Sequence, residues 1–240
     1  MKIIKHNAKI VFITVITLMI ASCNGFGPIK GNGKVVKQEK EVSEFNKINF
    51  EGAFNVFISQ GEQTKLTIEA DENLQDYVVA KIKNKKLSIK TKRNLSPSKE
   101  INIYLTVKTF DGIESSGAVI IKSMGKLNAD KLSLDMSGAS NIALDINCVE
   151  LRTNITGSST MKLIGAASFA DFDVSGSSEI NNFEMIFDDL KLKVKGSSKV
   201  KVNVLTKLDV SLTGSGEIEY MGTPDVKKEI SGSGSVTKLF

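Results

Sequence analysis

Hydrophobic and polar residues alternate along much of this chain, and a glycine between small or polar residues interrupts the alternation at regular intervals. Successive side chains of a β-strand point to opposite faces, so the pattern predicts strands with one buried and one exposed face. A hydrophobic residue follows each of these glycines by four positions, at Val56, Ile121, Ile142, Met161, Ile180, Val200, Ile218 and Val236. Each glycine therefore marks a corner between two strands.

The corner glycines form an internal repeat. They are Gly52, Gly117, Gly138, Gly157, Gly176, Gly196, Gly214 and Gly232. From the second of them onward the spacings are 21, 19, 19, 20, 18 and 18 residues, which indicates a repeating structural unit. We interpret these glycines as structural residues of tight bends, where larger side chains would collide.

Two kinds of all-β fold place corners at regular intervals. An antiparallel sandwich has a turn every ten or so residues. A solenoid stacks equivalent positions into ladders about 4.8 Å apart, so its composition repeats only once per coil. Here the second corner of each unit differs in composition from the glycine corner; it lies near Asp130, Cys148, Asp188, Thr206 and Asp225. The sequence therefore predicts a single-stranded β-helix or solenoid with coils of about 19 residues.

The repeat is interrupted between residues 60 and 110. Alternation at Leu66, Ile68 and Ala70 predicts a strand, further strands follow, and residues 71–82 have room for a short helical turn. We interpret this segment as a β-rich N-terminal insertion that caps the solenoid, because the first coil would otherwise expose an open sheet edge. The predicted domain spans residues 42–240 and follows a flexible, glycine-rich tether at residues 23–41.

The first 22 residues have the layout of an export signal. Three lysines precede an uncharged, mostly apolar run at residues 10–21, which is short for a helix that spans a bilayer. Residues 20–23 (IASC) resemble a bacterial lipobox, which implies that Cys23 is acylated and becomes the first residue after cleavage. The alternative is an ordinary signal peptide with a chance cysteine. We expect a lipid-anchored envelope protein, at the outer membrane because Asn24 follows the cysteine.

Charge does not indicate a polyanionic partner. The chain has 32 Lys+Arg and 27 Asp+Glu, a formal net charge of +5. Removing the three lysines of the leader leaves 29 basic and 27 acidic residues, so the mature protein is nearly neutral. Basic residues cluster between positions 81 and 93, but no aromatic residue interleaves them. We therefore predict no nucleic-acid partner.

The residue types that carry most enzyme chemistry are scarce. The single histidine, His6, lies in the leader, and after acylation of Cys23 the remaining cysteine is Cys148. Within one chain this excludes disulfides, zinc sites of the Cys/His type and histidine-based triads. Cys148 has an apolar neighbour, Val149, and no histidine to act as base, so we interpret it as structural. We expect no catalytic residue, no metal site and no cofactor.

Carboxylates leave one enzymatic alternative open, because solenoids also support lyases and hydrolases that use acidic residues and calcium. Glu114, Asp135 and Asp173 each precede a corner glycine by three positions. Asp135 and Asp173 should lie two coils apart, about 10 Å, whereas calcium holds its oxygen ligands at about 2.3–2.6 Å. We interpret this acidic column as a solvated ladder. The same interpretation applies to the lysines five positions after a glycine, which are Lys122, Lys162 and Lys201.

Four segments of the domain resemble a known family. They are residues 45–48 (FNKI), 52–56 (GAFNV), 70–74 (ADENL) and 231–236 (SGSGSV), with the repeated glycine corners before the last of them. Their order is similar to that of the head GIN domain family of autotransporter adhesins, over roughly residues 42–240. The resemblance implies a β-helix-like fold, an adhesin function and a frequent association with lipoprotein leaders. It brings no catalytic residue.

These observations favour a non-catalytic envelope lipoprotein that acts as an adhesin-like or ligand-binding module. Its expected partners are the membrane, through the lipid anchor, and a glycan, matrix or envelope-protein ligand. A carbohydrate-active enzyme that uses acidic residues is one alternative, and a purely structural scaffold is another. We also expect self-association, because no capping element is evident after the final coil, which stops at Phe240.

Overall fold

The computed structural model describes residues 27–239 and contains strands and one short 3₁₀ helix. The N-terminal elements are β1 (Ile29–Lys30), β2 (Val35–Lys40), β3 (Lys47–Gln60), β4 (Lys65–Asp71), η1 (Glu72–Tyr77), β5 (Val78–Lys83), β6 (Lys86–Thr91), β7 (Leu95–Ser96) and β8 (Asn102–Val107). The elements that follow are β9 (Gly112–Gly138), β10 (Asn141–Gly157), β11 (Thr160–Gly176), β12 (Glu179–Gly196), β13 (Lys199–Gly214), β14 (Glu217–Met221), β15 (Asp225–Gly232) and β16 (Ser235–Lys238).

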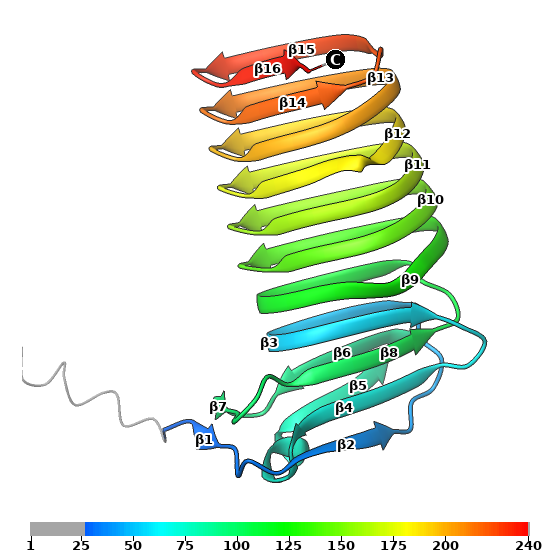
Figure 1. Ribbon diagram of the computed structural model, residues 1–240, viewed down its shortest axis with the longest axis vertical. Helices are drawn as coiled ribbons and strands as arrows, with labels where there is room; N and C mark the ends of the chain where they lie inside the picture. The colour runs from blue at the N-terminus through cyan, green and yellow to red at the C-terminus, as the bar shows by residue number, and fades with distance from the viewer. Residues whose placement is uncertain (1–26, 240) are drawn as a thin grey trace, which may run out of the picture.

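The long strands wind into a β-solenoid of about six turns (Figure 1). Each of β10 to β13 starts just after one glycine corner, bends at the second corner and ends on the next glycine. Neighbouring turns pair in parallel, for example Ile142 with Met161 and Gly157 with Gly176. Parallel pairing at a shift of one full repeat confirms the predicted solenoid and excludes the antiparallel sandwich.

The core is a set of mostly apolar ladders inside the coil. Leu134, Thr153, Phe172, Leu192 and Val210 stand in register four positions before successive glycines, and all five are buried. The ring of Phe172 meets that of Phe187 edge to face at 5.6 Å, which joins the two halves of neighbouring coils. Because inward positions stack on their equivalents, one alternating pattern fills the whole interior.

Residues 60–110 lie at the β3 end of the solenoid, where they form a cap (Figure 1). Strand β8 pairs in parallel with β3, and β4 and then β2 continue the sheet in antiparallel fashion. Strands β5 and β6 form a hairpin whose turn places Asn84 and Lys85 at positive φ. The short helical turn is η1, within the stretch where the sequence allowed one.

Strands β1 and β2 lie within residues 23–41, the stretch that the sequence predicted to be a flexible tether. Strand β1 pairs with β7, and β2 pairs with β4 from Val35↔Asp71 to Lys40↔Leu66. The buried carboxylate of Asp71 contributes to this arrangement, because it accepts hydrogen bonds from the Gly33 amide at 2.8 Å and from the amide and hydroxyl of Ser98 at 2.8 and 2.5 Å. Asp71 thus ties the N-terminal segment to the cap, together with the β2–β4 ladder and the side chains of Asn73 and Gln75.

The last described turn differs from the others at its inward positions. Lys228 pairs with Val210 and Lys238 with Tyr220, so lysines stand beside a buried and a partly buried residue of the turn below. Charged side chains that point along the open edge of a sheet discourage another strand from pairing there. This device was not recognised in the sequence, and it weakens the expectation of coil-on-coil self-association at this end.

Candidate functional site

The eight corner glycines stand in one column along the solenoid. Their φ angles lie between +100° and +138°, a backbone region that side chains with a Cβ rarely occupy. From Gly117 to Gly232, an added Cβ would lie 2.3–2.7 Å from the carbonyl oxygen of the glycine one turn below. That oxygen accepts a backbone hydrogen bond from the next turn, such as Ser177 N to Gly157 O at 3.0 Å. The column is therefore architectural.

A ladder of buried serines lies beside this column, two residues after the glycines. Its members are Ser140, Ser159, Ser178 and Ser198. The Ser178 hydroxyl accepts a hydrogen bond from the Ser159 amide at 3.1 Å and donates one to Gly157 O at 3.3 Å, and the same contacts recur on neighbouring turns. These hydroxyls form hydrogen bonds with the backbone, and residues 27–239 contain no histidine to activate them. Sequence analysis had recognised only that residues around the glycines are small.

The acidic column behaves as a structural ladder. Asp135 Oδ1 accepts a hydrogen bond from Asn154 Nδ2 at 2.5 Å, and Asn154 is also in register with Asp173 on its other side. Glu114 forms an ion pair with Lys86 of the cap at 2.5 Å. Within residues 27–239, no group of three or more His, Cys, Asp or Glu side chains gathers in a way that could hold a metal ion. Asp135 and Glu114 therefore each have a side-chain partner on another strand.

The predicted lysine strip is largely neutralised by ion pairs. Lys162 pairs with Glu184 at 2.6 Å and Lys201 with Glu219 at 3.1 Å. The Lys201 ammonium also lies 5.5 Å from the centre of the Phe183 ring. An exposed face of this kind alternates in sign, so it does not present a strong positive field to a polyanion.

Cys148 is half-buried at the second corner, in register with Ala129 and Ala167. Burial raises the pKa of its thiol to about 11. The thiol is therefore protonated at neutral pH, and the protonated form is a poor nucleophile.

The feature that sequence analysis missed is a corner trough, which we define as two adjoining hollows along the second corner. The larger has a volume of about 580 Å³ and is lined by residues that include Glu150, Leu151 and Arg152. The smaller, of about 230 Å³, is lined by residues of β12 and β13 that include Lys191 and Asp209. Phe169 and Ala170 border both hollows, so the two adjoin at this ring along the solenoid axis.

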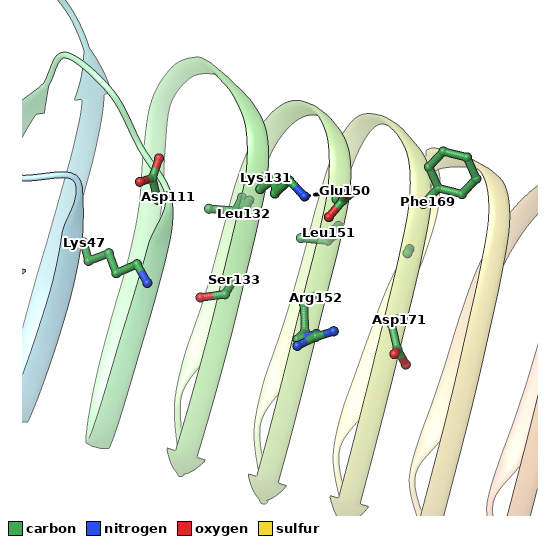
Figure 2. Close-up of a pocket in the computed structure, with 11 residues that line it drawn as sticks. Lys47, Asp111, Lys131, Leu132, Ser133, Glu150, Leu151, Arg152, Phe169 and Asp171 are labelled. Carbon is green, nitrogen blue, oxygen red and sulfur yellow. Dashed lines mark hydrogen bonds and ion pairs between the residues drawn. The ribbon is translucent and has the colours of Figure 1, made fainter.

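Phe169 stands out in this trough. It is in register with Glu150 on one side and Asp189 on the other, so an aromatic ring occupies a position that is charged on adjacent turns. Its side chain is 55% exposed. Figure 2 shows the ring directed away from the coil, in the row that contains the Lys131–Glu150 ion pair of 2.8 Å. The signal in the sequence was a phenylalanine at an outward position of the alternation.

Cys23 lies outside the described residues, so the structure does not bear on its acylation. Residues 27–239 contain no helix with the length and hydrophobicity needed to cross a bilayer.

Comparisons with known proteins agree on the fold. Among curated proteins none matches the chain. A solved structure from Bacteroides fragilis, described as a putative adhesin, has a TM-score of 0.84 at 22% identity and covers 88% of this chain and 100% of its own. A structure from Parabacteroides distasonis, described as a putative lipid binding protein, has a TM-score of 0.72 at 26% identity, with coverages of 89% and 100%.

A third structure, described as a putative adhesin from Parabacteroides merdae, has a TM-score of 0.66 at 21% identity and covers 90% of this chain and all of its own. The sequence profile of a family described as "Putative auto-transporter adhesin, head GIN domain" matches residues 44–224. This match spans most of the solenoid and the cap, as the resemblance in the sequence had indicated. The chain therefore belongs to the head GIN domain family of auto-transporter adhesins.

Proposed function

We propose that this protein is a non-catalytic adhesin-like module of the cell envelope, which binds a glycan, a matrix component or another envelope protein. The observation that carries the proposal is the parallel stacking of the turns from β9 to β13, which keep one register along the strand segments that lead into each corner glycine. This register stacks equivalent outward residues into long, rigid faces, and solenoids characteristically use such extended surfaces for binding. Membership of an adhesin family supports the same reading.

We further propose that Cys23 carries the lipid anchor and that the anchor places the protein at the outer membrane. Support comes from the export leader and the lipobox-like residues 20–23. Two acyl chains bind a membrane far more firmly than one, and many anchored copies on one surface strengthen individually weak contacts. The variant Cys23→Ala is expected to lose acylation and to move from the detergent phase to the aqueous phase on partition. Unchanged partition would overturn the anchor.

The binding proposal is tested with the purified mature domain on an array of polysaccharides, matrix proteins and envelope proteins, with and without calcium. Retention on at least one ligand without turnover is the expected result. Cleavage of a polysaccharide that Asp135→Asn abolishes would overturn the non-catalytic function and favour an enzyme. Failure to bind any member of the array would leave a structural scaffold as the better explanation.

A further inference from the structure

We propose that the corner trough binds a segment of a neutral polysaccharide chain and that Phe169 is the platform on which one sugar ring stacks. The inference rests on the proposed binding function and assigns it a site and a class of ligand. Three features of the trough support the proposal: the exposed ring, the shape of the floor and the order of the charges.

The exposed ring is an anomaly of the repeat. On the turns adjacent to Phe169, the equivalent positions are Glu150 and Asp189, whose charges are compatible with solvent. A phenylalanine that is 55% exposed leaves apolar ring surface in contact with water, and a ligand that covers this surface gains from its burial. The C–H face of a sugar ring covers such a surface well, because an aromatic side chain supplies a large, rigid contact area.

The floor of the trough is lowered beside this ring. The inward-facing column beneath it contains Leu151, Ala170 and Leu190 on three successive turns. Alanine is the smallest of the three, and Ala170 borders both hollows together with Phe169. The ring therefore stands over a depression with space on either side along the solenoid axis. A ligand that extends in both directions from the stacked unit, as a polymer does, fits this shape better than a compact small molecule.

The charges beside the ring alternate along the same axis. Arg152, Asp171, Lys191 and Asp209 are in register on four successive turns, about 4.8 Å apart. Figure 2 shows Arg152 and Asp171 on adjacent strands with no hydrogen bond or ion pair drawn to either. Within residues 27–239, none of the hydrogen bonds or ion pairs engages the Arg152 guanidinium.

This order of charges selects the class of ligand. Guanidinium and ammonium groups donate hydrogen bonds and carboxylates accept them, and a sugar hydroxyl can do both. An alternating row therefore suits a chain rich in hydroxyl groups. A polyanion would meet Asp171 and Asp209 at every second turn, and that repulsion offsets the attraction of the two cations. The combination of an apolar platform and a few polar groups is also the usual composition of a ligand site.

The test compares the mature domain with Phe169→Ala by affinity electrophoresis in gels that contain a linear neutral polysaccharide, such as a glucan, mannan or xylan. Leu205→Ala is the matched control, because Leu205 is 49% exposed at the second corner but does not line the trough. We expect Phe169→Ala to weaken binding by about tenfold or more, as the loss of a central aromatic contact does. Leu205→Ala should bind as wild type, Phe169→Tyr should retain most of the affinity, and Arg152→Gln should weaken binding several-fold.

The outcomes separate the two proposals. Equal retention of wild type and Phe169→Ala would overturn the trough as the site and leave the binding function intact. Retention by a polygalacturonate gel or a protein ligand alone would overturn the neutral glycan and again leave the binding function intact. Absence of binding to every polysaccharide and protein tested would overturn both. Thermal melts of the variants show whether each one is folded.

Discussion

The solenoid and the cap are both built from β-strands, but different contacts hold them in place. In the solenoid each kind of contact recurs from turn to turn: the serine hydroxyls, the corner glycines and the apolar ladders contact residues of the adjacent turn, 18–22 positions away. In the cap each contact is singular, such as the hydrogen bonds from Gly33 and Ser98 to Asp71, across 38 and 27 residues. A repeated contact is visible in a sequence as a pattern, whereas a singular one is not.

This difference changes how each region should respond to substitution. A defect at one coil of a solenoid breaks the stack between its two neighbours, because each repeat contacts only the repeats next to it. A defect in the cap removes one particular contact and leaves the coils beyond it unchanged. The following predictions test that distinction, from the largest expected effect to the smallest.

The largest effect is expected at a corner in the middle of the solenoid. In Gly176→Val the new Cβ would lie 2.3 Å from Gly157 O, at a φ of +118° that a β-branched residue does not tolerate. We expect a loss of at least about 4 kcal/mol in the free energy of unfolding, or failure to fold. Urea-induced unfolding followed by circular dichroism measures it. A variant with an unchanged midpoint would refute the crowded corner.

A smaller effect is expected in the cap. In Asp71→Asn the amide group cannot accept all the hydrogen bonds that the carboxylate accepts from Gly33 and Ser98, so part-buried donors lose a partner. We expect a loss of about 1–3 kcal/mol and faster hydrogen exchange at the Gly33 and Ser98 amides, with protection of β11 and β12 unchanged. The control is Asp76→Asn, an exposed carboxylate in η1. Faster exchange throughout the coils would contradict the distinction between the two regions.

The cap should also give the domain part of its sensitivity to acid. Burial alone would raise the pKa of Asp71, but hydrogen bonds from Ser98 and Gly33 outweigh it and hold the pKa below its ordinary value. A lowered pKa in the folded state stabilises the protein above the unfolded-state value of about 3.9. That contribution is lost as the pH falls through the unfolded-state value towards the folded-state pKa.

Thermal melts between pH 7 and pH 3 measure this dependence. We expect the wild type to lose more stability over that range than Asp71→Asn, because the variant has no carboxylate to protonate at this site. Parallel curves for the two proteins would show that Asp71 is not a source of the acid sensitivity.

The smallest effect is expected on the outer face of the solenoid. Lys162→Gln removes an ion pair with Glu184 in which both side chains are about half exposed. Exposed ion pairs contribute little because water screens them, so we expect a change within about 0.5 kcal/mol. Differential scanning calorimetry measures it beside Gly176→Val. A large loss at Lys162 would show that the charged ladders, and not only the corners, hold the coils together.

Much of the solenoid was predictable because its pattern has one physical cause. The alternation around residues such as Ile142 and Met161 predicted both the strands and their parallel stacking. The N-terminal boundary was not predictable in the same way. Residues 27–40 are rich in glycine and lysine, and their order depends on pairing with β4 and on a buried carboxylate far along the chain. The local composition of residues 27–40 does not indicate that such a distant partner exists.

The candidate site was likewise only partly predictable from the sequence. The sequence contained Phe169 at an outward position and Ala170 at an inward one, but each was one exception among many in the repeat. Their importance depends on the adjoining turns, which place Glu150 and Asp189 on either side of the ring and leave hollows beside it. A hollow exists only when several side chains are in place around it.

The sequence by itself determined the coil length, the corner glycines, the inward and outward faces and the scarcity of histidine and cysteine chemistry. These properties follow from local sterics and from a period that repeats along the chain. Only the tertiary structure decided the position of the N-terminal strands, the partners of Glu114 and Asp135, and the trough beside Phe169. Each of these depends on which residues from distant turns meet, and that is fixed when the coils stack against one another and against the cap.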